Sequence, residues 1–142
     1  MRLTKHFTLE EFTRSQTATR EGIDNTPSTE SVQNLIRVAY TLEIIRLELG
    51  APISISSGYR SQELNARIKG SFKSRHMAGL AADFTVQGYT PAEAVAKIRK
   101  IVGFNKLILE FNSWVHLDLS SDLKNEVLEA YKSGGKTQYK VI

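Results

Sequence analysis

Residues 106–119, KLILEFNSWVHLDL, contain two apolar runs on either side of the polar pair Asn112 and Ser113. Each run has the length of a β-strand, and the polar pair is typical of a hairpin turn. Side chains of a strand point to opposite faces in turn. The residues of the second run that share its apolar face are Val115, Leu117 and Leu119. The sequence therefore predicts an antiparallel hairpin with one face packed against a hydrophobic core.

The other face of the second predicted strand is polar. By the same alternation, Trp114, His116 and Asp118 lie together on that face. An aromatic ring, an imidazole and a carboxylate suit the wall of a binding site, but a face in contact with water has the same composition. The strand alone leaves these two interpretations equally open.

Further elements are predicted upstream of the hairpin. The clearest is a helix over residues 29–49, where apolar side chains recur every three or four residues and Gly50 provides a stop. Three shorter helices, each with a serine or threonine as N-cap, are predicted over residues 7–12, 61–68 and 91–102. Two strands are predicted over residues 53–57 and 80–86.

Two segments have no predicted regular structure. Residues 14–28 are polar and contain Pro27, which is typical of a surface loop or arm. Residues 134–142 follow a Ser-Gly-Gly sequence and are expected to be a loosely held tail. The folded domain is accordingly predicted over residues 1–133.

Length and composition limit the possible chemistry. A chain of 142 residues suits one domain. The absence of cysteine excludes disulfides, iron–sulfur clusters, thiol nucleophiles and Cys-ligated zinc, so any metal must be held by histidines and carboxylates. The formal net charge of +4 favours contact with an anionic polymer such as the bacterial wall. The basic residues are scattered, and no nucleic-acid partner is expected.

The hydrophobic pattern gives an expectation about location. No stretch reaches 18 apolar residues, and the N-terminal residues lack the continuous apolar core of a signal peptide. We therefore expect a protein that is synthesised in the cytoplasm and does not insert into a membrane.

Three residues together have the composition of a zinc site. Asp83 lies within the apolar run of residues 80–84, where a buried carboxylate needs a metal or an arginine as partner. His76 precedes this run and, taken alone, is more often structural. His76, Asp83 and His116 together offer two imidazoles and one carboxylate. Three such ligands leave the fourth position of Zn²⁺ for a water molecule, so the set predicts a hydrolytic zinc site.

Glu110 is the candidate general base, because it is the one acidic residue of the first hairpin strand. With a two-residue turn it would point into the core. With a three-residue loop over residues 112–114 it would lie opposite His116, about 5 Å away at Cβ. We predict the three-residue loop; the alternative role for Glu110 is a surface salt bridge.

Arg60 follows the predicted strand of residues 53–57 directly, in the segment Ser57-Gly58-Tyr59-Arg60-Ser61. A guanidinium at that position suits bidentate binding of a carboxylate or stabilisation of a developing oxyanion. An ion pair that ties the loop down explains the residue equally well.

These residues, in this order, resemble the zinc D-alanyl-D-alanine peptidase family. That family includes bacterial D,D-carboxypeptidases, vancomycin-resistance dipeptidases and phage endolysin peptidases, with the hedgehog signalling domain as a relative. The resemblance covers roughly residues 3–120. It rests on Ser57-Gly58-Tyr59-Arg60-Ser61, on Ser74, His76, Gly79, Ala81 and Asp83, and on Trp114 and His116.

The resemblance implies a small α+β domain with a central, mainly antiparallel sheet flanked by helices. It implies that His76, Asp83 and His116 bind zinc and that Arg60 takes part in catalysis. The residues implied to contact substrate are Arg60, Ser74, Tyr59 and Trp114. The implied reaction is hydrolysis of a peptide bond in the peptidoglycan stem peptide.

The position of the base departs from the family pattern. Many members carry the catalytic acid three residues before the last histidine, where this chain has Ser113. Glu110 lies six residues before it, a spacing similar to that of the hedgehog-like branch. Asp118 is the alternative, either as the base or as a partner that orients a ligand histidine.

The expected function is therefore that of a zinc D,D-carboxypeptidase or endopeptidase, such as a phage or prophage lysis enzyme. It is expected to be a monomer that acts on the wall after release or as a virion component. The alternative is a zinc-binding module without activity, such as a phage tail component.

Overall fold

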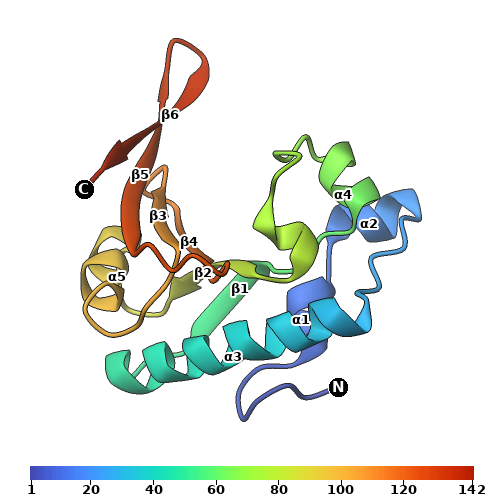
Figure 1. The fold of residues 1–142 in the computed structure, drawn as a ribbon, viewed down its shortest axis with the longest axis horizontal. Helices are drawn as coiled ribbons and strands as arrows, with labels where there is room; N and C mark the ends of the chain where they lie inside the picture. Colours follow the sequence, from blue (N-terminus) through green and yellow to red (C-terminus); the bar gives the residue numbers. More distant parts are fainter.

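A six-stranded sheet forms the centre of the computed structural model, which describes residues 1–142 (Figure 1). The strand order is β1-β2-β4-β3-β5-β6, and every neighbouring pair is antiparallel except β3 and β5. The strands are β1 (Ile53–Ser57), β2 (Ala81–Val86), β3 (Lys106–Glu110), β4 (Trp114–Asp118), β5 (Glu126–Ser133) and β6 (Lys136–Val141). The predicted α+β class and mainly antiparallel sheet are confirmed.

The helices are α1 (Leu9–Thr13), α2 (Gln16–Glu21), α3 (Thr29–Leu49), α4 (Gln62–Arg67) and α5 (Pro91–Ile98), with a 3₁₀ turn, η1 (Arg75–Ala78). Of these, α1, α3 and α5 cover one face of the sheet. The main core lies between α3, α5 and one side of the strands, to which Phe84, Leu107 and Leu117 belong. Strand alternation then places the intervening side chains, among them Asp83 and His116, on the opposite face.

The ends of the helices follow from capping residues. The predicted capping box of Thr8 and Glu11 is present at α1, and a second one joins Thr90 and Glu93 at α5. Gly50 ends α3 in the left-handed conformation that glycine adopts without steric cost. Helix α5 is shorter than predicted and ends at Ile98.

The predicted loop at residues 14–28 is partly wrong, because Gln16–Glu21 forms α2. Ser15 caps the first turn by accepting a hydrogen bond from the Ala18 amide, and Gly22 ends the helix at φ +66°. The only buried residue of α2 is Ala18, so the helix has almost no apolar periodicity. Figure 1 shows α2 beside α4, and an ion pair between Glu21 and Arg67 joins them.

The C-terminal segment also differs from the prediction. Lys136–Val141, expected as a loose tail, forms β6 and pairs with β5 along its length. Strand β5 had no predicted counterpart. It lies parallel to β3, and the β5–β6 hairpin extends away from the helices (Figure 1).

The register of the β3–β4 hairpin differs from the prediction by two residues. Its loop does have three residues, but they are Phe111, Asn112 and Ser113. Glu110 therefore pairs with Trp114, and His116 lies opposite Ile108. A shift by two residues keeps every side chain on its face, so Glu110 and His116 remain on the same side of the sheet, as predicted.

Candidate metal centre

Asp83 and His116 are brought together by the pairing of β2 with β4, in which they are direct neighbours. The Nδ1 atom of His116 lies 2.8 Å from Oδ1 of Asp83. Both residues are on the face opposite the core, next to apolar neighbours such as Ala82 and Val115 that are fully buried. The sheet register thus fixes the distance between these two candidate ligands.

His76 reaches the same point from η1. Ser74 caps this turn by accepting a hydrogen bond from the His76 amide at 3.2 Å. The Nδ1 atom of His76 lies 2.6 Å from the carbonyl oxygen of Gly58. Because a carbonyl only accepts, Nδ1 carries the hydrogen and Nε2 keeps a free lone pair. That Nε2 lies 3.3 Å from Oδ1 of Asp83.

Position 58 requires glycine, because the backbone passes very close to α1 at this point. A Cβ atom at this position would lie 2.6 Å from the carbonyl oxygen of Phe12, which is too close for any side chain. The Tyr59 amide donates to that same oxygen at 2.7 Å. The approach holds the carbonyl of Gly58 where it orients the His76 ring.

The ligand atoms of His76, Asp83 and His116, called the metal cluster below, all lie within 4.8 Å of one another. His76 and Asp83 are buried, with 3% and 7% of their surface exposed. Two imidazole nitrogens and one carboxylate oxygen, with no thiolate, are the donor set of catalytic zinc sites. The residues present therefore fit a zinc ion.

The protonation states also suit a metal. Burial raises the pKa of Asp83, but the hydrogen bond from His116 and the charge of that ring outweigh burial and hold the pKa well below its usual range. Burial lowers the pKa of His76 more than Asp83 raises it, so this ring is neutral. Burial also lowers the pKa of His116, yet its contact with Asp83 raises it overall. A divalent cation would displace the proton that these two residues share.

Glu110 and the metal cluster line the same cavity. The cavity has a volume of about 670 Å³. The side chain of Glu110 is half-buried at the end of β3. Burial raises the pKa of Glu110, Asp83 raises it further, and His116 and Arg60 oppose the rise. A carboxylate with a raised pKa beside a metal site is suited to accept a proton and release it again.

Arg60 lies on the other side of Asp83, with Nη2 3.5 Å from Oδ2. Its Nε donates to Ser57 Oγ at 3.2 Å and its Nη1 to Asn65 Oδ1 at 3.3 Å. Burial lowers the pKa of Arg60 more than the charges of Asp83 and Glu110 raise it, but a guanidinium is so weak an acid that the group keeps its charge. The guanidinium is thus fixed at the edge of the cavity.

The remaining predicted residues are divided between two places. Ser74 and Trp114 line the cavity of the metal cluster. Tyr59 does not; its side chain lines a second cavity, formed with α2. Asp118 also lines the cavity of the metal cluster, but its oxygens accept hydrogen bonds from Asn105 and Ser120 and from no histidine of the cluster.

The cavity also contains residues that the sequence did not predict, among them Leu128 of β5 and Tyr139 of β6. Tyr139 and the candidate base Glu110 line the same cavity; burial raises the pKa of Tyr139, and the charge of Glu110 adds to the rise. Only recognition of the β5–β6 hairpin would have indicated Leu128 and Tyr139.

None of the helices combines the length and the apolar composition that a membrane-spanning helix needs.

Comparison with known proteins agrees with this geometry. Residues 5–118 match the family model described as Peptidase M15. The chain belongs to the Peptidase M15 family. This is a family of zinc metallopeptidases, so the protein is a hydrolase of the D-Ala-D-Ala carboxypeptidase type with zinc as cofactor and a peptide as substrate. No curated protein matches the chain.

The family assignment confirms the resemblance found in the sequence. All three residues of the metal cluster lie within the matched segment, as do Arg60 and Glu110. Strands β5 and β6 lie beyond it. The chain therefore adds a hairpin to one wall of the cavity outside the part that matches the family.

Proposed function

We propose that this zinc peptidase hydrolyses a peptide bond in the stem peptide of bacterial peptidoglycan, as a D,D-carboxypeptidase or endopeptidase. The observation that supports it most directly is the shared cavity in which the metal cluster, Glu110 and Arg60 meet. A metal, a base and a cation around one space are groups that metal-dependent peptide hydrolysis uses.

Zinc bound by His76, Asp83 and His116 would polarise the scissile carbonyl and make a water molecule acidic near neutral pH. Glu110 takes a proton from the attacking water onto a carboxylate oxygen and then passes it to the leaving amine nitrogen. Arg60 donates hydrogen bonds toward the negative charge that develops on the carbonyl oxygen. Ser74 and Trp114 position the peptide along the cavity wall.

The biological setting is part of the same proposal. The net charge of +4 favours contact with an anionic cell wall. A phage or prophage lysis enzyme that is made in the cytoplasm and reaches the wall on release, or as part of the virion, would use this charge. We propose that it acts as a monomer, because one chain contributes every group of the cavity.

The test compares wild type with Glu110→Gln on purified bacterial walls, with zinc content measured by elemental analysis. We expect about one zinc per chain in both proteins, new muropeptide ends with wild type, and a roughly 100- to 10,000-fold lower rate in the variant. Glu126→Gln is the matched control, because Glu126 is exposed on the neighbouring strand β5. It should keep the full rate.

Other results would point elsewhere. Zinc without release from any wall would favour the zinc-binding module that lacks activity. A larger loss of rate in Asp118→Asn than in Glu110→Gln would assign the role of base to Asp118.

A further inference from the structure

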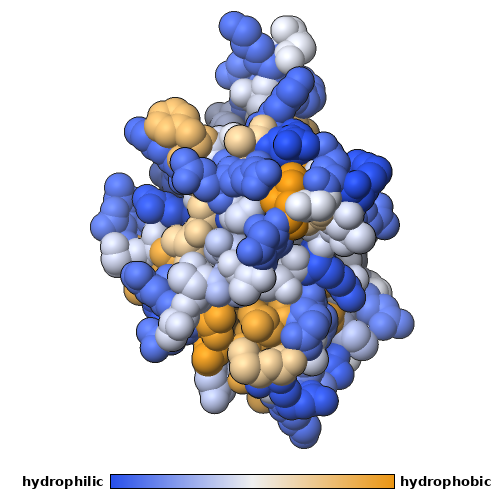
Figure 2. Space-filling model, turned by 90° about the vertical axis from the view of Figure 1, so that its right-hand side faces the viewer, coloured by the Kyte–Doolittle hydropathy of each residue, from blue (hydrophilic) through white to orange (hydrophobic).

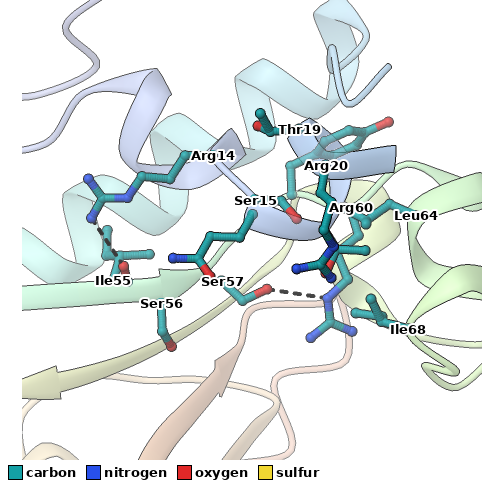
Figure 3. A pocket seen from close by; sticks show the side chains of 13 residues that line it. Arg14, Ser15, Thr19, Arg20, Ile55, Ser56, Ser57, Arg60, Leu64 and Ile68 are labelled. Carbon is teal, nitrogen blue, oxygen red and sulfur yellow. Dashed lines mark hydrogen bonds between the residues drawn. The ribbon is translucent and has the colours of Figure 1, made fainter. Parts of the chain in front are cut away.

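A second cavity, of about 790 Å³, adjoins the metal cluster on the far side of Arg60. Arg60 lines both cavities. The other walls come from α2 and the two residues before it, from β1 and from α4 (Figure 3). The segment of residues 14–28, which had no role in the sequence analysis, therefore builds one side of a space that opens beside the proposed active site.

Three arginines line this second cavity, Arg14, Arg20 and Arg60, and we call it the arginine cavity. None of its thirteen lining residues is acidic. Hydroxyl groups supply further hydrogen-bond donors, from Ser15, Thr17, Thr19, Ser56, Ser57 and Tyr59. A space of this composition attracts an anion and offers it donors on several sides.

Two of the arginines have no carboxylate partner. Arg14 donates a long hydrogen bond, 3.4 Å, to the carbonyl oxygen of Ile55, and no ion pair involves Arg14 or Arg20. Glu21, the acidic neighbour of Arg20, is paired with Arg67 of α4 instead. In Figure 3, Arg14 reaches over Ile55 at one side of the cavity, and Arg20 and Arg60 lie at the other.

The wall that carries these arginines is held in a defined position. Asn25 donates to the carbonyl oxygens of Thr13, at 2.8 Å, and Tyr59, at 3.2 Å, and accepts from the Ser61 amide at 2.7 Å. Asn25 thus ties the segment after α2 to the loop that carries Arg60. The surface on the side of α2 and α4 is mostly hydrophilic, with hydrophobic atoms in small patches (Figure 2).

We propose that the arginine cavity binds a carboxylate of the peptide substrate while the scissile bond lies at the metal cluster. The inference rests on the proposed peptidase function and adds its specificity: the enzyme selects an acidic peptide. Arg60 would contact the substrate from between the two cavities, and Arg14 and Arg20 would act only in recognition.

The test uses three fluorescein-labelled stem pentapeptides that end in D-Ala-D-Ala. The first has free carboxylates at its glutamate and at its C-terminus, the second has the glutamate carboxylate converted to an amide, and the third has a C-terminal amide. Binding to the zinc-loaded full chain is read by fluorescence anisotropy directly after mixing, and cleavage by chromatography. The amide that weakens binding identifies which carboxylate the cavity holds.

We expect wild type to bind the first peptide about tenfold more tightly than one of the two amides, the change typical of losing a charged hydrogen-bond partner. The double variant Arg14→Gln with Arg20→Gln should bind all three equally. The control is Arg37→Gln with Lys100→Gln, which removes the same charge from exposed positions outside both cavities. It should keep the preference.

A double variant that keeps the wild-type preference, or a wild type without preference, would overturn the proposal. If circular dichroism shows that the double variant is unfolded, Arg20→Gln alone decides, because this exposed side chain has no bonded partner to lose. Acid-dependent binding without cleavage would leave the cavity assignment standing and overturn the proposed function. Cleavage of wall peptides without a preference for the acidic peptide would support the proposed function and overturn the assignment of the arginine cavity.

Discussion

The metal cluster and the arginine cavity meet at Arg60, but different forces hold them. The residues of the metal cluster lie on or beside the central strands β2 and β4, above a core of fully buried side chains such as Phe84 and Leu117. The outer wall of the arginine cavity comes from the N-terminal segment. Phe12 ties that segment to the main core, whereas residues 14–28 add only a small apolar cluster of Ala18 and Ile23 with Leu64 of α4. Polar contacts, notably those of Asn25, join residues 14–28 to the loop that carries Arg60.

The difference shows how the fold divides its tasks. Groups that react must be held within fractions of an ångström, which the hydrogen-bonded register of a sheet provides. Groups that recognise a flexible peptide tolerate more movement, and a short helix tied by side chains is sufficient. Changes in the sheet should therefore affect zinc and turnover, whereas changes in the N-terminal segment should affect substrate affinity and stability.

The largest effect is expected from His116→Ala, which removes one ligand from the metal cluster. We expect loss of the bound zinc and a fall in wall hydrolysis of at least about 1,000-fold, because zinc supplies several kcal/mol of transition-state stabilisation. Elemental analysis measures the zinc content, muropeptide release measures hydrolysis, and circular dichroism shows whether the variant is folded. The control is His6→Ala, which should keep its zinc, because His6 is hydrogen-bonded to Glu43 and does not belong to the metal cluster. A His116→Ala protein that retains zinc would show that the metal is held elsewhere.

Arg60→Lys tests the residue that the two regions share. A lysine keeps the charge but loses the planar fork that reaches Ser57, Asn65 and Asp83. We expect kcat to fall about 100-fold, with unchanged zinc content, and the preference for an acidic peptide to decrease as well. Steady-state kinetics on the acid and amide peptides separate the two effects. A change confined to KM would limit Arg60 to recognition.

The sequence predicted correctly on which face of the sheet the side chains of β2 and β4 lie. Period-two alternation placed His116 away from Val115 and Leu117, and an acidic residue in an apolar run marked Asp83. The same reasoning predicted that the hairpin loop has an odd number of residues, but it did not predict which residues pair. Parity decides which face a side chain takes, whereas a shift of two residues changes no face and leaves no trace in the hydrophobic pattern.

The N-terminal and C-terminal walls could not be predicted in the same way. Helix α2 buries only Ala18, so its sole signals were the caps Ser15 and Gly22. Strand β6 is almost entirely exposed, and its stability comes from pairing with β5, which is a tertiary contact. The cavity residues Tyr139 and Leu128 therefore became visible only with the sheet assembled.

Asn25→Ala tests whether the N-terminal segment serves recognition. The variant loses two donated bonds and one accepted bond that hold the wall of the arginine cavity. We expect KM for the acidic peptide to rise about tenfold, while zinc content and kcat stay near wild type. Gln33→Ala is the control, since the amide side chain of Gln33 is exposed on α3, outside both cavities. An equal fall of kcat on acid and amide peptides would show that the segment supports the reacting groups instead.

The smallest effect concerns the anchor at Glu43 of α3. Its carboxylate accepts hydrogen bonds from Thr4 Oγ1 at 2.7 Å, from the His6 amide at 2.6 Å and, at 2.7 Å, lies against Nδ1 of His6. Burial raises the pKa of Glu43, but the hydrogen bonds from His6 and Thr4 outweigh it, so the pKa is lowered from its ordinary value of 4.5. We expect Glu43→Gln to reduce the free energy of unfolding by about 1 to 2 kcal/mol at pH 7, with zinc content unchanged.

The pH dependence of that difference follows from the sign of the shift. A carboxylate whose pKa is lower in the folded protein stabilises the fold fully above its unfolded pKa, and this stabilisation is lost as the pH falls through the folded pKa. The wild-type advantage should therefore be constant from pH 7 down to about pH 5 and shrink below pH 4.5. Urea unfolding of both proteins across this range measures it. A difference that persists unchanged at pH 3 would mean that the side chain stabilises the segment by packing and not by its charge.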